Sequence, residues 1–192
     1  MKLKKIILGL IRTFLNIFFK PSVSGIQNLN IDGGYVITAN HKSNWDGIFL
    51  YAFLKKDLYF MAKAELFRNK LFGYFLKKFG AFPVKREEND LAAIKHAIHI
   101  LNDGKILGIF PQGKRTDELD VDDAKAGAVL LASRCKKPLI PVAISGEYKF
   151  RNHVNIVIGE PIYFGDKKLT PDELNLSTVG VMKKIKELSE TK

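Results

Sequence analysis

Apolar and polar positions follow one another in blocks of two kinds, and these blocks predict strands that alternate with helices. Short apolar runs rich in β-branched and aromatic side chains favour buried strands. The strands predicted in this way are residues 35–40, 58–62, 81–85, 106–110, 139–144 and 154–159. Longer runs with a helical period predict helices at residues 47–56, 64–79, 91–101 and 126–135. Thr170, Pro171 and Glu173 form a capping-box pattern that opens a final helix.

This alternation is typical of βαβ units, so we expect an α/β fold with a mostly parallel central sheet flanked by helices. Asp46 and Asp90 stand at the starts of the first and third of the predicted helices, where they can act as caps. In open parallel sheets, ligands bind beyond the carboxyl ends of the strands. Polar clusters directly follow three of the predicted strands, so we expect these clusters to meet at one edge of the sheet.

The first twenty residues, MKLKKIILGLIRTFLNIFFK, place apolar side chains over a wide arc of a helix. At about 100° per residue, Lys2, Lys5, Arg12 and Lys20 fall on one narrow strip, and Lys4 lies outside it. Arg12 interrupts the apolar stretch, which is therefore shorter than the roughly 20 residues that a membrane-spanning helix needs. The pattern is typical of a helix lying in a membrane interface, and the alternative is a helix packed on the core.

We expect residues 1–21 to form an amphipathic, membrane-associating helix and residues 22–192 to form one domain. The chain has 192 residues, which support one hydrophobic core and hardly two. Its single cysteine, Cys135, allows no intrachain disulfide, which fits a reducing, cytoplasmic setting. These features predict a peripheral or monotopic protein on the cytoplasmic face of the cell membrane.

The net charge of +11 comes from 31 basic and 20 acidic residues, and the basic excess is uneven. The first twenty residues carry five basic groups and no acid, and residues 55–86 carry nine basic groups against two acids. A basic surface can bind nucleic acid, anionic lipid or an acidic partner. No recognised nucleic-acid-binding motif accompanies the charge, so we expect no nucleic-acid partner.

The stretch TANHKSNWDG, residues 38–47, brings His41 and Asp46 within five positions of each other. On a regular helix they would lie about 140° apart, so a strand-to-helix turn that folds the carboxylate back to the imidazole explains the pair better. Such a carboxylate fixes the ring tautomer and leaves the other nitrogen free as a base. Ser43 lacks the glycines of a nucleophile elbow, so the pair suits activation of a hydroxyl that the substrate brings. The alternative is that His41 is only a turn or capping histidine.

Two basic clusters follow other predicted strands. The residues of interest in them are Lys85, Arg86, Gln112, Gly113, Lys114 and Arg115. The tight Pro-Gln-Gly loop exposes backbone N–H groups, which with the cationic side chains would hold a phosphate, and the alternative is solvated charges beside a turn. The glycines match neither the Walker nor the dinucleotide fingerprint. His96 and His99 share a helix face without a carboxylate or thiolate at ligand spacing, so we expect no metal site.

Taken in order, these clusters resemble the four sequence blocks of the glycerolipid acyltransferase family, most closely of its members that acylate 1-acylglycerol 3-phosphate. The resemblance covers about residues 25–160. The matching residues are His41 and Asp46 for the His-x₄-Asp block, Gly80, Phe82 and Arg86 for the second block, FPQGKR for Phe-Pro-Glu-Gly-Thr-Arg, and Ile140, Pro141 and Val142 for the fourth. Each block alone is a weak signal, whereas four in order are a specific one.

The resemblance implies transfer of a fatty acyl group from acyl-CoA or acyl carrier protein to the free hydroxyl of lysophosphatidic acid, which gives phosphatidic acid in phospholipid biosynthesis. His41 would take the hydroxyl proton and Asp46 would orient His41, with no acyl-enzyme and no cofactor. The residues that would hold the substrate phosphate are Lys85, Arg86, Gln112, Gly113, Lys114 and Arg115. The membrane lipid bilayer would be a further partner, because substrate and product both reside in it.

Two positions depart from the family pattern: Gln112 stands where the family has glutamate, and Lys114 where it has threonine. Glutamine keeps a hydrogen-bonding carbonyl but loses the charge, which leaves open a different acceptor, such as glycerol 3-phosphate or another lysolipid. A non-catalytic membrane-binding protein is the alternative from another class, and the intact His41 and Asp46 argue against it.

Overall fold

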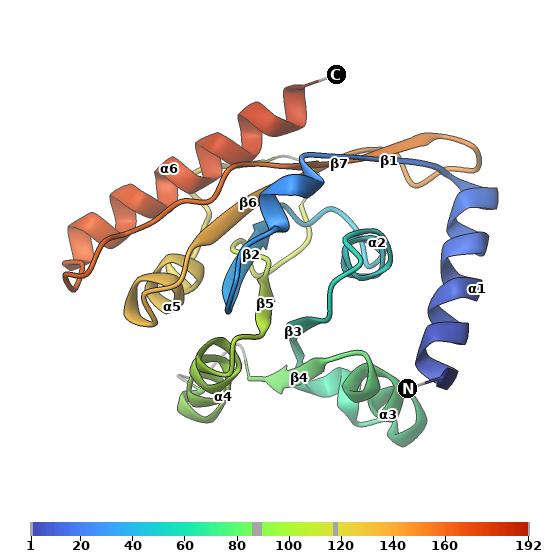
Figure 1. The fold of residues 1–192 in the computed structure, drawn as a ribbon, viewed down its shortest axis with the longest axis horizontal. Coiled ribbons are helices and arrows are strands. Elements are labelled where there is room, and N and C mark those ends of the chain that lie inside the picture. Colours follow the sequence, from blue (N-terminus) through green and yellow to red (C-terminus); the bar gives the residue numbers. More distant parts are fainter. Residues whose placement is uncertain (1, 86–89, 117–118, 192) are drawn as a thin grey trace.

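The computed structural model describes residues 2–85, 90–116 and 119–191. Seven strands in this part of the chain form one central sheet (Figure 1). They are β1 (Lys20–Ser24), β2 (Tyr35–Ala39), β3 (Leu58–Lys63), β4 (Ala81–Val84), β5 (Ile106–Ile109), β6 (Leu139–Gly146) and β7 (His153–Ile158). Their order is β1-β7-β6-β2-β5-β3-β4, and every neighbouring pair is parallel except β6 and β7. The prediction of a mostly parallel sheet is confirmed.

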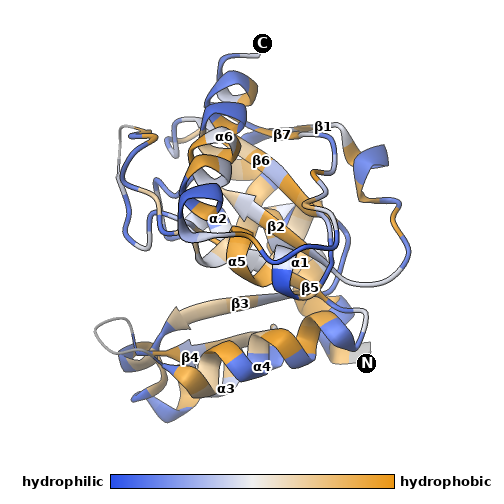
Figure 2. Cartoon of the chain, turned by 90° about the vertical axis from the view of Figure 1, so that its left-hand side faces the viewer, coloured by the Kyte–Doolittle hydropathy of each residue, from blue (hydrophilic) through white to orange (hydrophobic). Residues whose placement is uncertain are grey.

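Helices cover both faces of this sheet (Figure 1). The helices are α1 (Lys2–Phe18), α2 (Trp45–Phe53), α3 (Lys70–Lys78), α4 (Leu91–Asn102), α5 (Gly127–Arg134) and α6 (Pro171–Glu190). In β2, Tyr35 and Ile37 join the core under α1 and α2, whereas Val36 joins the core under α4, α5 and α6. The central strands are mostly hydrophobic (Figure 2), as expected for parallel strands that are buried on both faces.

The sequence pattern does not predict β1, which begins inside the segment expected to be helical. α1 ends at Phe18, and the chain continues from Lys20 as an edge strand that pairs in parallel with β7, with Lys20 opposite His153. The residues of β1 alternate between exposed and half-buried positions. Such a short, polar edge strand depends on its partner for order, because its own composition has little strand preference.

The single helix expected over residues 64–79 is wrong, because the segment is divided in two. Ala64–Phe67 form a 3₁₀ turn, and α3 begins only after Asn69. The Asn69 side chain accepts a hydrogen bond from the backbone N–H of Phe72 at 3.0 Å. In a continuous helix this N–H would bond to the backbone carbonyl four residues earlier. Its bond to a side chain instead caps the start of a new helix.

Two of the three predicted caps are confirmed. Asp90 accepts a hydrogen bond from a backbone N–H in the first turn of α4 at 2.9 Å, and Thr170 with Glu173 makes both bonds of a capping box. The third is wrong: Asn44 is the N-cap residue of α2, and Asp46 lies within the first turn of that helix. The Asp46 side chain points back toward the preceding turn, where it has other donors.

α1 packs on the domain along one side. Leu15 and Phe19 are buried in the core. Lys4 forms an ion pair with Asp57 at 2.8 Å, and Nε of Arg12 donates to a backbone carbonyl of α2 at 2.5 Å. Arg12 therefore faces the domain, so the basic strip of this helix lies at least in part on its packed side.

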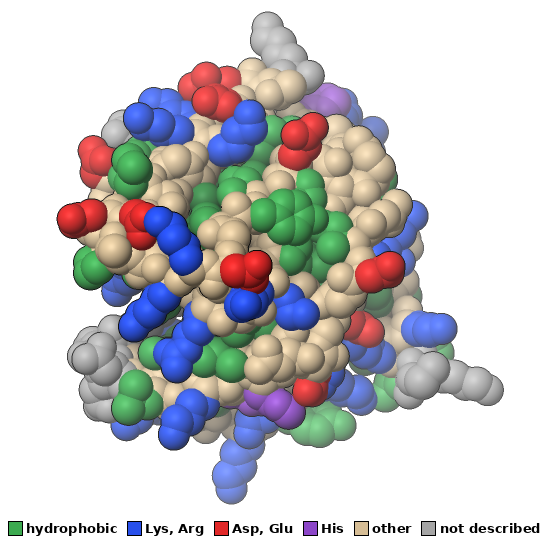
Figure 3. Space-filling model, turned by 60° about the vertical axis from the view of Figure 1, so that its left-hand side comes forward, with side chains coloured by type: hydrophobic (Ala, Val, Ile, Leu, Met, Phe, Trp, Pro, Cys, Tyr) green, Lys and Arg blue, Asp and Glu red, His purple; other side chains and the backbone are tan. Residues whose placement is uncertain are grey.

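The outward side of α1 is apolar. Leu3, Ile6, Leu10 and Ile17 are 58, 59, 67 and 55% exposed. Within the described residues, no helix combines the length and the hydrophobicity that crossing a bilayer requires. The face drawn in Figure 3, which lies on the other side of the molecule, carries Lys and Arg side chains interspersed with acidic ones.

Candidate active site

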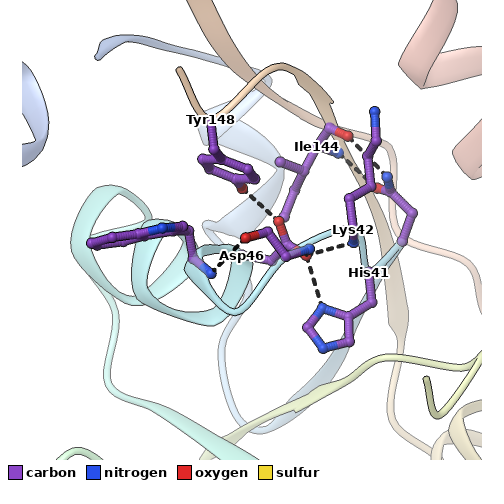
Figure 4. Close-up of polar contacts among 8 residues, drawn as sticks. His41, Lys42, Asp46, Ile144 and Tyr148 are labelled. Atoms are coloured by element: carbon purple, nitrogen blue, oxygen red, sulfur yellow. Dashed lines mark hydrogen bonds and ion pairs between the residues drawn. The ribbon is translucent and has the colours of Figure 1, made fainter. Parts of the chain in front are cut away.

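His41 and Asp46 meet in the turn between β2 and α2 (Figure 4). Nδ1 of His41 lies 2.8 Å from Oδ2 of Asp46, so the predicted strand-to-helix turn is confirmed. A carboxylate can only accept, so Nδ1 carries the proton and Nε2 is left as a base. The Asp46 side chain is fully buried, whereas 14% of the His41 side chain is exposed. A buried acid thus orients an imidazole that a substrate can reach.

Four donors surround the Asp46 carboxylate. Its Oδ2 accepts from the backbone N–H groups of Lys42 and Ser43, both at 2.7 Å, in addition to the His41 ring. Its Oδ1 accepts from the Tyr148 hydroxyl at 2.5 Å. A buried charged group is tolerated only where hydrogen bonds replace the lost water, and here both oxygens have donors. Asp46 is therefore held in one orientation toward His41.

A deep, largely apolar groove of about 1470 Å³ lies beside His41. Its walls come from α1, α2, α3 and β3, and its apolar lining includes Leu8, Ile11, Phe14, Trp45, Ile48, Tyr51, Phe60, Phe72, Phe75 and Phe79. Phe110 stacks on the His41 ring with centroids 4.1 Å apart, which joins the imidazole to the apolar wall. The groove can hold a long hydrocarbon chain with its reacting end beside the imidazole.

Lys114 and Arg115 line the same groove as His41, as the meeting of polar clusters at one sheet edge predicts. The Lys114 ammonium pairs with Asp123 at 2.7 Å, and the hydrogen bond to that carboxylate raises the pKa of Lys114. Lys63, at the end of β3, also lines the groove, although its position in an apolar strand gave no signal in the sequence. Lys42 lines it too, so four cationic side chains share the groove with the base.

Three other residues of the predicted phosphate site, Lys85, Gln112 and Gly113, do not line this groove. Gln112 is buried and lines a second pocket of about 440 Å³, which shares Lys42 and Thr116 with the groove. Gly113 turns the same loop with a left-handed φ of 66°. Lys85 follows β4 and does not line the groove, and Arg86 lies outside the described residues.

The arrangement offers a base without an adjacent enzyme nucleophile. The Ser43 hydroxyl accepts a hydrogen bond from the backbone N–H of Trp45 at 3.3 Å and is not hydrogen-bonded to His41. Across residues 2–85, 90–116 and 119–191, no three His, Cys, Asp or Glu side chains gather closely enough to hold a metal ion. The chemistry that these groups support directly is proton removal from a hydroxyl of a bound substrate.

Residues 20–145, more than half of the chain, match the family model described as acyltransferase. The chain belongs to the acyltransferase family. This acyltransferase is 41% identical over 170 residues to a 1-acyl-sn-glycerol-3-phosphate acyltransferase of Bacillus subtilis (strain 168), and the match covers 84% of each chain. A protein of the same name from Streptococcus pneumoniae is 36% identical over 151 residues, which are 75% of this chain and 56% of that one.

The acyltransferase also has a solved structural counterpart. The crystal structure of the 1-acyl-sn-glycerophosphate (LPA) acyltransferase PlsC from Thermotoga maritima matches it with a TM-score of 0.75. The match covers 100% of this chain and 83% of that chain, at 24% sequence identity. The two proteins therefore share a fold.

Sequence reasoning missed two residues that hold the dyad of this acyltransferase. Tyr148 lies 102 positions after Asp46, in the connection between β6 and β7, and no motif marks it. Burial, the Asp46 charge and the hydrogen bond to Asp46 raise the pKa of Tyr148 far above its usual value, so it remains a donor. Asn40 is buried and exchanges hydrogen bonds of 2.9 and 2.8 Å with the backbone of Ile144, which fixes the end of β2 on β6. In the sequence, the position of Asn40 directly before His41 was the one feature that pointed to it.

Proposed function

We propose that this acyltransferase transfers a fatty acyl group from an acyl thioester to the free hydroxyl of 1-acylglycerol 3-phosphate, giving phosphatidic acid. The observation that carries the proposal is the His41–Asp46 dyad beside an apolar groove that also contains cations. A lysophospholipid has a hydroxyl, an apolar chain and a phosphate, one for each of these features. The names of the relatives from B. subtilis and S. pneumoniae support the same activity.

In the proposed reaction, Nε2 of His41 takes the proton of the acceptor hydroxyl while that oxygen attacks the thioester carbonyl. Asp46 stabilises the imidazolium that forms. The tetrahedral intermediate then breaks its C–S bond, and the departing thiolate takes the proton from His41. General-base help of this kind contributes about 10²–10⁴-fold to the rate, and positioning of the reactants contributes more. The substrate supplies the nucleophile, so neither an acyl-enzyme nor a cofactor is required.

We assign the groove to a fatty acyl chain and its cations to the phosphate. Each buried methylene contributes roughly 0.8 kcal/mol, so a long chain is bound strongly by burial alone. Arg115 is the main phosphate ligand in this assignment, because a guanidinium binds a phosphate with two parallel hydrogen bonds and Lys114 is already paired with Asp123. Gln112 does not line the groove, so its replacement of the family's glutamate alters no side chain of the groove wall. Acyl-CoA and acyl carrier protein present the same thioester, and either can serve as donor.

We further propose that the acyltransferase binds the cytoplasmic face of the membrane peripherally, through α1 and α3. Leu3, Ile6 and Ile17 on α1, and Leu71 and Tyr74 on α3, are more than half exposed. Both helices also contribute walls to the groove, so one bilayer contact would bring the groove to the lipids. α3 and its flanks carry basic side chains that favour anionic headgroups; they are Lys63, Arg68, Lys70, Lys77 and Lys78.

The test is an acyl-transfer assay of the purified protein. The acceptors are 1-acylglycerol 3-phosphate, glycerol 3-phosphate and a lysophosphatidylcholine, each with acyl-CoA and with acyl carrier protein as donor. We expect phosphatidic acid from the first acceptor, and a loss of at least about 10²-fold in kcat for His41→Ala. Faster acylation of glycerol 3-phosphate would refute the acceptor, and full activity of folded His41→Ala protein would refute the mechanism. His99→Ala, which alters an exposed histidine of α4, is the matched control.

A further inference from the structure

Tyr148 lies outside the four sequence blocks and does not line the groove. We propose that Tyr148 is a positioning residue, which holds Asp46 and thereby sets how well His41 acts as a base. The inference rests on the proposed role of the His41–Asp46 dyad. Tyr148 itself touches no substrate in this scheme, so its effect has to pass through the carboxylate.

The two carboxylate oxygens of Asp46 have different hydrogen-bond donors. Lys42, Ser43 and His41 all donate to Oδ2, whereas Tyr148 is the donor to Oδ1 (Figure 4). Asp46 is fully buried, so no bulk water reaches Oδ1 in place of the tyrosine. Without the hydroxyl, a buried charged oxygen loses its partner, and the carboxylate loses the contact that opposes its rotation.

The Tyr148 ring is fixed from two sides. It makes edge-to-face contacts with Phe19 and Phe49, with centroid distances of 5.9 and 5.3 Å. The loop that carries Tyr148 is tied to the end of α1, because the backbone N–H of Arg151 donates to the carbonyl of Phe18 at 2.6 Å. The hydroxyl therefore has one available direction, toward Asp46.

The hydroxyl also changes the charge that His41 meets. A strong donor on Oδ1 withdraws negative charge from the carboxylate, and its loss leaves more of that charge facing the imidazole. The negative charge that the imidazole meets is therefore larger in the absence of the hydroxyl, and the pH dependence of kcat can report this change. Among the described residues that line the groove with His41, the charged ones are Lys42, Lys63, Lys114 and Arg115, and removal of the Tyr148 hydroxyl leaves all of them in place.

The charged residues on either side of Tyr148 do not contact the dyad. Glu147 and Lys149 pair with each other at 3.0 Å on the surface, and both are exposed. Neither side chain is hydrogen-bonded or ion-paired to Asp46 or His41. The hydroxyl of Tyr148 is therefore the group to remove, and phenylalanine removes it while keeping the ring that packs on Phe19 and Phe49.

The experiment measures kcat, KM and the pH dependence of kcat for Tyr148→Phe. We expect kcat to fall about 10-fold near neutral pH with KM for both substrates within about twofold of wild type. We also expect the acid limb of the pH profile to move to higher pH, so that raising the pH recovers part of the lost rate. Tyr35→Phe is the matched control, because Tyr35 is also buried and its hydroxyl bonds to the Leu29 carbonyl, away from Asp46.

His41→Ala measured alongside separates the two possible failures. If His41→Ala is inactive while Tyr148→Phe has normal kcat and an unmoved acid limb, the positioning role of Tyr148 is wrong and the dyad stands. If Tyr148→Phe changes kcat no more than Tyr35→Phe does, the effect is one of packing and the proposal is also wrong. If His41→Ala retains full activity, the proposed role of the dyad is wrong, and the role of Tyr148 that rests on it is wrong as well.

Discussion

The backbone N–H of Thr116 donates a hydrogen bond to the carbonyl oxygen of His41 at 2.9 Å. This bond joins the loop after β5 to the turn after β2, and the two strands are themselves hydrogen-bonded neighbours. The loop that carries Lys114 and Arg115 is thereby held against the turn that carries the base. The two segments have different assigned roles. Variants in the turn should therefore affect the chemical step, and variants in the loop should affect phosphate binding.

Asp46→Asn should reduce kcat by about 10⁴-fold, the size of effect that a wrong histidine tautomer has in a comparable pair. An asparagine amide can present an N–H to Nδ1, which moves the ring proton to Nε2 and removes the base. Steady-state kinetics at saturating acceptor measure the change, and circular dichroism checks the fold. Asp57→Asn is the control, because Asp57 is exposed and its side chain bonds to Lys4 and Tyr51 and not to the dyad. A kcat within tenfold of wild type would contradict the assigned role of Asp46.

Arg115→Ala should chiefly raise KM for the phosphorylated acceptor. A lost charged hydrogen bond costs about 1.5–3 kcal/mol, which is roughly a 10- to 150-fold loss in kcat/KM. KM measured separately for acceptor and donor decides between phosphate binding and thioester binding. Arg134→Ala, at the exposed end of α5, is the matched control. A rise confined to KM for the thioester would show that Arg115 holds the donor.

The parts of the fold that follow from local patterns could be predicted from the sequence. The buried strands and the His41–Asp46 turn depend on residues close together in the chain, and both are confirmed. β7 runs antiparallel to β6 because only a short connection joins them, whereas a parallel pair needs a long crossover. Tyr148 could not be found in this way, because its contact with Asp46 spans 102 positions and exists only after the sheet has formed.

Glu173→Gln should destabilise the protein more at neutral pH than in acid. The hydrogen bond from Lys167, followed by that from the backbone N–H of Thr170, lowers the pKa of Glu173 from 4.5 to about 2. A depressed carboxyl pKa adds stability above its unfolded value, and that stability is lost as the pH falls through the folded value. The difference in Tm between wild type and Glu173→Gln should therefore be largest above pH 5 and should shrink toward pH 2. Thermal denaturation at several pH values tests this, with Glu187→Gln on the same helix as control.

Membrane binding through α1 is best tested without removing the helix, because Leu15 and Phe19 belong to the core and a chain that starts near Ser22 would lose them. Leu3, Ile6 and Ile17 are exposed, so replacing all three with Gln leaves the packed side of α1 unchanged. The triple variant should bind vesicles that contain anionic lipid much more weakly than wild type, because burial of this apolar face in the interface dominates binding.

Salt separates the two contributions to this binding. The Debye length, beyond which the attraction between charges is largely screened, falls from about 10 Å at 0.1 M to about 3 Å at 1 M ionic strength. High salt should weaken but not abolish co-sedimentation of the wild-type protein, because the apolar part remains. Activity of the triple variant on a short-chain, water-soluble acceptor should persist, because His41 and Asp46 are untouched. The matched variant on α3 is Leu71→Gln with Tyr74→Gln, which alters two exposed side chains outside the groove. If the α1 variant sediments like wild type and the α3 variant does not, α3 alone carries the membrane contact; if both sediment like wild type, the proposed membrane surface is wrong.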